Sequence, residues 1–318
     1  MRAIRVSAFG GPEVLKLEDV VLPKPGPGEL LLKVKAVGVN PVETYVRSGI
    51  YPNKPALPYT PGSDCAGLVE ETGKDVSKFN IGDRVYSFGT LSGSYAEYAL
   101  VHESRIQFLP ENVSFEQGAA LGVPYGTAYQ ALFVRAQAKA GESVLVHGAS
   151  GGVGLAACQW AHSAGLKVFG TGGSPAALKA IEANGAHAAF DHHSPGYLEQ
   201  IRERNHGKGP DIILEMLANV NLAKDLGALA LRGRVVIIGS RGPIEIDPRM
   251  TMGRDLAILG MANSNAQNLA ANHEAIYAGL EQGILKPVIA EKLPLAEAAK
   301  AHEQVMKNGK IGKIVLLP

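Results

Sequence analysis

A glycine-rich run near the middle of the chain carries the clearest chemical signal. Residues 147–154 read His-Gly-Ala-Ser-Gly-Gly-Val-Gly, which fits the spacing A-x-G-x-x-G. The run follows a short apolar strand pattern at 143–147 and opens a helical pattern at 153–164. Glycines let the backbone approach a pyrophosphate, and the N–H groups and dipole of a helix N-terminus attract the anion. The run predicts a dinucleotide site rather than an empty turn, with the pyrophosphate at Ser150, Gly151, Gly152 and Val153.

The end of the next strand pattern bears on which dinucleotide binds. Sites that prefer NAD usually carry Asp or Glu there, about 20 residues after the glycines, to bind the ribose 2′-hydroxyl. Residues 168–174 read Val-Phe-Gly-Thr-Gly-Gly-Ser and contain no carboxylate. A 2′-phosphate would meet no repulsion, and Gly173 and Ser174 could offer donors. Lys179 would add positive charge, or would be an ordinary solvated helix lysine. NADPH is therefore predicted over NADH.

Two different secondary-structure patterns along the chain indicate which fold positions this turn. The first hundred residues predict short β-strands at 30–37, 65–71 and 83–88, bounded by Gly, Pro and Asp, which favours a β barrel or sandwich. From Pro124, apolar strands alternate with helical patterns, as in a doubly wound parallel sheet. We expect strands at 166–170, 212–215 and 234–239, and a helix at 175–184.

The tail fits this alternating rhythm poorly. It predicts helices at 271–282 and 296–308 and a strand at 313–317. We therefore expect an α/β protein in which residues 262–318 return to a first domain of residues 1–123, with a dinucleotide domain of residues 124–261 between them.

Composition excludes some classes of function. The 31 basic residues against 30 acidic residues give a net charge of +1, which favours neither nucleic acid nor a membrane as partner. The two cysteines, Cys65 and Cys158, do not make a disulfide scaffold, so a reducing cytosol is expected. No apolar run approaches the roughly 18 residues that span a bilayer. A soluble, cytoplasmic protein is predicted.

Several segments resemble the medium-chain dehydrogenases/reductases. Residues 38–45, 58–64 and 82–85 and the glycine-rich run occur in the order found in that family. Within that family, the sequence is similar to the zeta-crystallin-like NADPH:quinone reductases at residues 11–17, 147–158, 215–221 and 239–242. The resemblance weakens only between Ala262 and Gln282. It implies a GroES-like barrel built from the N-terminal part and the tail, a Rossmann domain, an active site in the cleft, and a homo-oligomer, dimer or tetramer.

The same resemblance argues against zinc. Zinc-dependent relatives place Cys where this chain has Asn40, a His-Glu pair at Ser63-Asp64, and four cysteines after residues 82–85. Two cysteines cannot form a four-cysteine site. The adjacent His192 and His193 are more typical of a solvated loop than of a metal site. We therefore expect no metal. Without zinc as a Lewis acid, oxidation of an alcohol is difficult, whereas reduction of a quinone or enone is easier.

The resemblance also assigns residues. Cofactor positions are implied at Tyr45, Ser150, Gly151, Gly152, Val153, Gly173, His192, Asn221, Ile238, Gly239, Ser240 and Arg241. Arg241 could meet a phosphate or be a surface arginine, and His192 could stack on the adenosine end.

Candidates for catalysis are Asn40, Tyr45, Tyr51 and Thr127. The Asn40 amide could donate to a carbonyl of the acceptor. Tyr51, like Tyr59, could line the cleft or simply pack. Thr127 would bind the cofactor amide or cap the helix that follows.

The leading hypothesis is reduction of quinones by NADPH, in one-electron or two-electron steps. An enone or enoyl-thioester reductase would need the same turn and the same lack of zinc. A different class, binding of AU-rich RNA, is implied by the resemblance, but the balanced charge gives it little support. A structural role in the lens rests on the family name alone.

Overall fold

The chain divides into two compact units. A computed structural model describes residues 1–318. Unit 1 contains Met1–Gly126 and Asn268–Pro318, and unit 2 contains Thr127–Gln267. The tail therefore belongs with the N-terminal part. The borders fall at 126/127 and 267/268, where the sequence had suggested 123/124 and 261/262.

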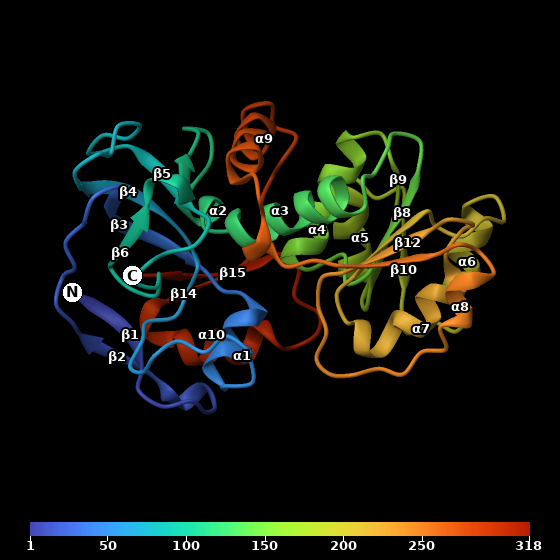
Figure 1. The fold of residues 1–318 in the computed structure, drawn as a ribbon, viewed down its shortest axis with the longest axis horizontal. Helices are drawn as coiled ribbons and strands as arrows, with labels where there is room; N and C mark the ends of the chain where they lie inside the picture. Colours follow the sequence, from blue (N-terminus) through green and yellow to red (C-terminus); the bar gives the residue numbers. More distant parts are fainter. The chain divides into compact units, whose positions relative to one another are not determined.

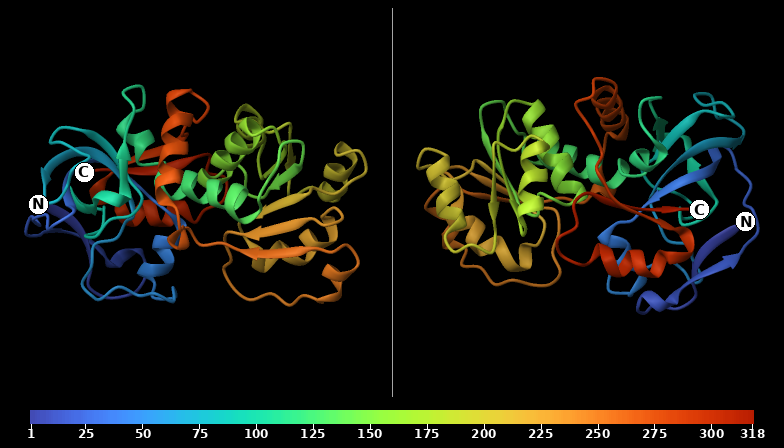
Figure 2. Two further views of the ribbon diagram at one scale, coloured as in Figure 1. Left: turned by 45° about the horizontal axis from the view of Figure 1, so that its top comes forward. Right: turned by 180° about the vertical axis from the view of Figure 1, so that it is seen from behind.

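Unit 1 is built on β-structure. A seven-stranded sheet has the order β14-β15-β3-β4-β5-β7, with β6 also pairing with β3, and β1 and β2 form a separate antiparallel pair. The strands are β1 (Arg2–Val6), β2 (Leu15–Asp19), β3 (Glu29–Gly38), β4 (Asp64–Thr72), β5 (Arg84–Ser87), β6 (Tyr98–His102), β7 (Ile106–Phe108), β14 (Ile289–Pro294) and β15 (Lys313–Leu317). Figures 1 and 2 show the C-terminal strand β15, in red, beside the N-terminal strands.

Short helices complete unit 1. They are α1 (Pro41–Arg47), α2 (Phe115–Gly118), α9 (Leu269–Glu281) and α10 (Ala298–Val305), with 3-10 turns η1 (Pro12–Val14), η2 (Glu103–Arg105) and η5 (Leu295–Glu297). The core joins distant parts of the sequence, because Leu30 and Leu32 of β3 pack in one cluster with Ile314 and Leu316 of β15. Both strands are buried along most of their length, so the tail completes the core of the first domain.

Unit 2 is a doubly wound parallel sheet. Its order is β10-β9-β8-β11-β12-β13, the 3-2-1-4-5-6 arrangement of dinucleotide-binding folds. The strands are β8 (Ser143–Val146), β9 (Lys167–Gly172), β10 (Ala188–Asp191), β11 (Ile212–Glu215), β12 (Arg234–Ile237) and β13 (Ala257–Gly260). The helices are α4 (Gly152–Ser163), α5 (Pro175–Ala183), α6 (Tyr197–Arg204), α7 (Ala218–Ala228) and α8 (Arg249–Met252), and η4 spans Asn263–Asn265.

The central strands of unit 2 explain the apolar runs in the sequence. Leu145 and Ile213, on β8 and β11, are fully buried and pack with Ile201 of α6 and Leu226 of α7. Helices α4 and α5 follow β8 and β9 on the opposite face, as right-handed crossovers require (Figure 1). The α/β class and the doubly wound parallel sheet expected from the sequence are confirmed.

Two strands of this sheet were not expected. β10 has only half-buried residues and β13 is mostly exposed, and each is four residues long, so the apolar run that marks each strand is short. The helix expected at 296–308 is shorter, because α10 ends at Val305. The other expected helices agree with α4, α5 and α9 to within one or two residues at each end.

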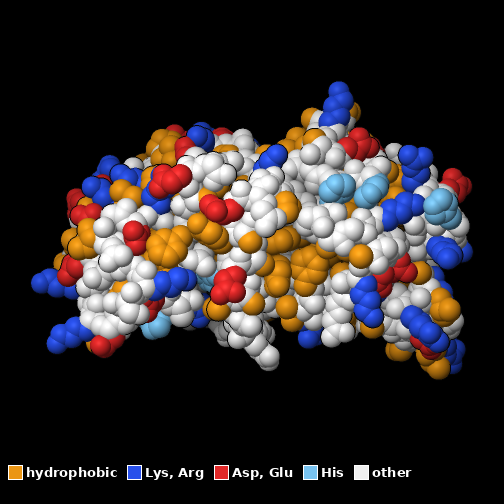
Figure 3. All heavy atoms as spheres, turned by 90° about the horizontal axis from the view of Figure 1, so that it is seen from above, with side chains coloured by type: hydrophobic (Ala, Val, Ile, Leu, Met, Phe, Trp, Pro, Cys, Tyr) orange, Lys and Arg blue, Asp and Glu red, His pale blue; other side chains and the backbone are white.

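The distribution of surface charge and the state of the two cysteines match what the composition predicts. On the face shown in Figure 3, acidic and basic side chains are interspersed rather than gathered into a basic area. Cys65 and Cys158 are free and buried, so they form no disulfide. None of the helices combines the length and the apolar character that a membrane span requires.

Candidate functional site

The direction of winding reverses between β8 and β11 in unit 2. The chain leaves β8 toward β9 on one side and leaves β11 toward β12 on the other. Such a switch point opens a crevice at the carboxyl ends of the strands, where open α/β sheets bind ligands. The glycine-rich run follows β8 directly, and Asn221 and Ile238–Arg241 follow β11 and β12. The fold therefore places these predicted cofactor residues at one edge of one sheet.

The glycine-rich turn has the geometry that a pyrophosphate needs. Gly148 adopts a positive φ of 56°, which favours glycine, and Gly151 is the N-cap of α4. A Cβ on Gly154 would lie 2.5 Å from Ala149 Cα and from Gly148 O, so the helix packs against the turn without room for a side chain. A Cβ on Gly151 would meet only Gly148 O at 3.5 Å. The open backbone at Gly151 and the N-terminus of α4 fit an anionic group.

Residues expected at the adenosine end lie around the end of β9. Gly173 is exposed, and a Cβ there would lie 3.1 Å from His192 Nε2 and 3.0 Å from His193 Nε2. Both histidines are exposed, with ring centroids 4.3 Å apart. Ser174 caps α5, because its Oγ accepts a hydrogen bond from Ala177 N at 3.2 Å. Although His192 is exposed, partial desolvation of its ring and the neighbouring His193 lower its pKa.

Charge at this end comes from two further residues. Lys179 is exposed on α5. Asp191, at the end of β10, is the nearest acid along the neighbouring strand, and its Oδ1 accepts a hydrogen bond from His193 N at 2.9 Å. The carboxylate of Asp191 is thus engaged with its own loop.

The loops after β11 and β12 are joined to each other. Asn221 Nδ2 donates to Glu215 Oε1 at 3.3 Å, and Ala218 N donates to Gly239 O at 2.9 Å. Arg241 N donates to Asn219 Oδ1 at 2.8 Å, while the Arg241 side chain is exposed. The structure therefore brings together Asn221 and the Ile238–Arg241 segment, far apart in the sequence.

In unit 1, the amide of Asn40 is engaged inside a polar cluster. Asn40 is 2% exposed, and its Nδ2 donates to Glu43 Oε1 at 3.2 Å and to Asp64 Oδ2 at 3.0 Å. Its Oδ1 accepts from the ammonium of Lys313, which also donates to Asp64 Oδ2 at 3.1 Å. The predicted donation from Asn40 to an acceptor carbonyl requires one of these bonds to break. Its role toward a substrate stays a prediction.

Buried charges in this cluster are balanced by dense hydrogen bonding. Burial raises the pKa of Glu43, but this carboxyl accepts from Tyr95 OH at 2.7 Å, from Asn40 N at 2.9 Å and from Ser63 N at 3.2 Å. Burial lowers the pKa of His302 to about 3, so its ring is neutral and contacts Tyr95 OH at 3.0 Å. Several donors to one carboxylate favour its charged form.

The sequence did not single out Glu43, Tyr95, His302 or Lys313. A weak signal existed for Glu43, because Asn followed three residues later by Glu is a helix-start pattern. Lys313 gave none, since a lysine at the start of a predicted strand is usually exposed.

The remaining catalytic candidates fall in different places. Tyr45 lies on α1 and Tyr51 in the loop that follows, where Tyr51 N donates to Tyr45 O at 3.2 Å. Both rings are half-buried, and so is Tyr59. Thr127 is buried within α3 (Gly122–Tyr129), which continues as the π-helical turn η3 (Gln130–Arg135). The alternative that Thr127 caps a following helix is wrong, because the helix has already begun five residues earlier, at Gly122.

Comparisons with known proteins cover the whole chain. The family description "Alcohol dehydrogenase GroES-like domain" matches residues 26–111, and "Zinc-binding dehydrogenase" matches residues 152–276. Quinone oxidoreductase of Mus musculus is 55% identical over 323 residues, which cover 100% of this chain and 98% of the relative. Quinone oxidoreductase of Rattus norvegicus is 54% identical over 321 residues, with the same coverage.

Solved structures of related oxidoreductases also superpose on the whole chain. A structure described as an NAD-dependent alcohol dehydrogenase superposes with a TM-score of 0.93 at 31% identity, over 100% of both chains. Escherichia coli quinone oxidoreductase complexed with NADPH superposes with a TM-score of 0.92 at 28% identity, also over 100% of both chains.

The packing of the glycine-rich turn predicts that alanine destabilises the protein at Gly154 but is tolerated at Gly151. In Gly154→Ala, the new Cβ meets backbone that cannot move aside, so the free energy of unfolding should fall by about 1–3 kcal/mol. In Gly151→Ala, the Cβ makes only an ordinary contact, and the loss should stay below about 1 kcal/mol. Urea unfolding of both variants measures this. Equal losses would contradict the tight packing of Gly154 against Gly148 and Ala149.

Proposed function

Because this chain belongs to the quinone oxidoreductases of the medium-chain dehydrogenase/reductase superfamily, we propose that it reduces quinones with NADPH as the reductant. The chain is an oxidoreductase. The observation that carries the proposal is a sequence identity of 55% to a quinone oxidoreductase over 100% of this chain. A glycine-rich turn at the switch point of the sheet accompanies it.

The residues of unit 2 would hold the reductant. The bound dinucleotide supplies a hydride from its nicotinamide ring. The turn Ser150–Val153 and the N-terminus of α4 bind the pyrophosphate, and the loops carrying Asn221 and Ile238–Arg241 hold the adjoining part. Thr127 orients the nicotinamide amide, and Asn40, Tyr45 and Tyr51 orient the acceptor and exclude water. The reduced acceptor takes its proton from water, so no strong acid is needed.

A catalytic zinc does not fit the residues of unit 1. The family description names zinc, but Asn40 supplies an amide, and the ammonium of Lys313 fills the space between Asn40 Oδ1 and Asp64 Oδ2. Zinc sites need thiolate, imidazole or carboxylate ligands around an open centre, and a buried ammonium repels a second cation. We therefore propose zinc-independent reduction.

Steady-state kinetics with NADPH test the proposed acceptor. Ortho-quinones should give a kcat/KM at least about tenfold above that of 2-alkenals, a difference of about 1.4 kcal/mol in transition-state free energy. The reverse ranking would favour the enone-reductase alternative. Absence of turnover on both, with NADPH binding intact, would contradict catalysis. RNA binding stays a prediction, and no observation in the structure favours it.

Cofactor preference rests on the exposed backbone at Gly173. No acid lies in residues 168–174, so a 2′-phosphate would meet no charge from this segment. In Gly173→Asp, a carboxylate should weaken NADPH binding at least about tenfold and spare NADH, because like charges repel. Gly173→Asn has the same shape without the charge and should keep the preference for NADPH. Titrations followed by nicotinamide fluorescence measure this, and tighter NADH binding by the unaltered protein would overturn the argument.

The edge of the parallel sheet favours a homo-oligomer. β13 is the outer strand, and its apolar residues Ala257 and Ile258 are exposed while Leu259 is half-buried. An exposed apolar edge strand is a template for pairing with another strand. We propose that two copies pair through β13 about a twofold axis, which makes the contact self-complementary.

A charge on that strand should prevent assembly. Ile258→Lys places an ammonium at the proposed contact, so the mass measured by light scattering should fall to that of one chain. Val220→Lys is the matched control, since Val220 is 50% exposed on α7, away from the strand. An unchanged mass for Ile258→Lys would contradict pairing through β13.

A further inference from the structure

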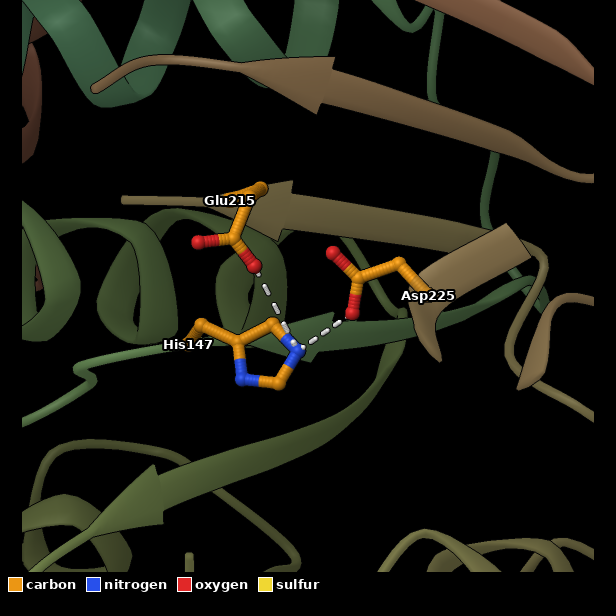
Figure 4. Close-up of side chains that lie close together, drawn as sticks. All are labelled: His147, Glu215 and Asp225. Atoms are coloured by element: carbon orange, nitrogen blue, oxygen red, sulfur yellow. Dashed lines mark hydrogen bonds and ion pairs between the residues drawn. The ribbon is translucent and has the colours of Figure 1, made fainter. Parts of the chain in front are cut away.

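Three titratable side chains meet beneath the switch point of unit 2. His147 follows β8, Glu215 ends β11, and Asp225 lies on α7, and all three are buried. His147 Nε2 lies 2.9 Å from Asp225 Oδ1 and 3.7 Å from Glu215 Oε2 (Figure 4). The proposed reaction uses none of them, although such groups are costly to bury unless they are paired and hydrogen-bonded.

Glu215 contacts both loops that carry predicted cofactor residues. Its Oε1 accepts hydrogen bonds from Leu217 N and from Asn221 Nδ2, both in the segment after β11. Its main-chain oxygen accepts from Ile238 N at 2.9 Å and from Gly239 N at 3.2 Å, in the segment after β12. One residue therefore fixes the position of Asn221 and of the Ile238–Gly239 turn.

The network also reaches the glycine-rich turn. His147 Nδ1 lies 3.4 Å from Thr171 Oγ1, and the same hydroxyl accepts a hydrogen bond from Gly148 N at 3.2 Å. Asp225 holds the opposite ring nitrogen, so the imidazole is fixed from both sides. The carboxyl of Glu215 faces this fixed ring with Oε2 and anchors the loop with Oε1.

We propose that Glu215 is a positioning residue for the cofactor site, held by His147 and Asp225 and acting through Asn221 and the Ile238–Gly239 turn. The inference rests on the proposed function, because it assumes that these loops bind the dinucleotide. Glu215 itself need not touch the cofactor. Its two hydrogen bonds through Oε1 set where Asn221 can reach, and loss of the side chain would leave the segment after β11 free to shift. The main-chain bonds to Ile238 and Gly239 would remain.

The charge state of the cluster supports this arrangement. Burial raises the pKa of Glu215 and that of Asp225, and burial lowers the pKa of His147. Lys224, beside Asp225, lowers the pKa of that carboxyl, and Tyr197 lies edge-on to the His147 ring. Because the raised pKa values favour protonated carboxyl groups, the cluster need not hold two negative charges beside a neutral imidazole.

Two substitutions at Glu215 separate the anchor from the charge. Glu215→Ala removes the acceptor for Leu217 N and Asn221 Nδ2, so the Kd for NADPH should rise about ten- to a hundredfold, as when a supporting residue behind a ligand site is lost. At saturating NADPH, kcat should change less than about threefold. Glu215→Gln keeps an oxygen at Oε1 and should restore the Kd to within about threefold of the unaltered protein.

Asp211→Ala is the matched control for a loss of stability alone. Asp211 sits at the amino-terminal end of the same strands, where its Oδ2 accepts from Ser143 N and from Ser143 Oγ, each at 2.7 Å. This variant should lower the midpoint of thermal unfolding and leave the Kd for NADPH unchanged. If Asp211→Ala and Glu215→Ala weaken NADPH binding equally, or if Glu215→Ala leaves it unchanged, the positioning role is overturned.

Two further results keep the outcomes distinct. If the unaltered protein binds no NADPH, the proposed function fails before Glu215 is tested. The ligand-type atoms of the three side chains lie within 4.8 Å of one another, so a metal is the competing explanation of the cluster. We expect protein treated with EDTA to keep its affinity for NADPH. Loss of affinity that Zn²⁺ restores would overturn the role of hydrogen bonds.

Discussion

The structure of unit 2 depends on β8 pairing in parallel with β9 on one side and with β11 on the other. This pairing buries both faces of the central strands and sends the following connections in opposite directions. The carboxyl ends of β8 and β11 are then the place where backbone N–H groups and polar side chains can face a ligand. The glycine-rich turn, Asn221 and the Ile238–Arg241 segment follow from that one arrangement.

Burial of charge is a second constraint. In both units a buried carboxylate accepts a hydrogen bond from a backbone N–H group at the start of a helix. In unit 1, Asp64 Oδ1 accepts from Val123 N at the start of α3, at 2.8 Å. In unit 2, Glu215 accepts from Leu217 N, directly before α7. Each carboxylate uses a free N–H group at a helix start, where the helix dipole favours negative charge. Such bonds tie a strand end to the beginning of a helix.

The two clusters differ in how the remaining charge is balanced. Lys313 places an ammonium against Asp64, so unit 1 contains its own buried cation. In unit 2, His147 has its pKa lowered by burial and stays neutral, and the carboxyl groups of Glu215 and Asp225 have raised pKa values instead. An ammonium balances the buried charge in unit 1, and in unit 2 the raised pKa values favour a proton on a carboxyl group.

Local pattern made much of the fold predictable. The strand over 313–317 and the helices that became α4 and α5 were readable because an apolar strand, a glycine turn and an amphipathic helix each have a short-range signal. β10 and β13 were not readable, because they lie at the edges of the sheet and are less buried. Of the two alternatives for Thr127, the helix cap is wrong, because α3 begins at Gly122 and already contains it.

The sequence by itself determined the dinucleotide turn, the absence of an acid after Val168 and the lack of cysteine ligands at the family's zinc positions. These depend on residue type and on spacing within a few residues. Only the tertiary structure decided that Asn40 is held by Lys313, 273 positions away, and that His147 joins Glu215 to Asp225. Contacts of that kind arise from strand order and burial, which place distant residues together and leave no periodic trace in the chain.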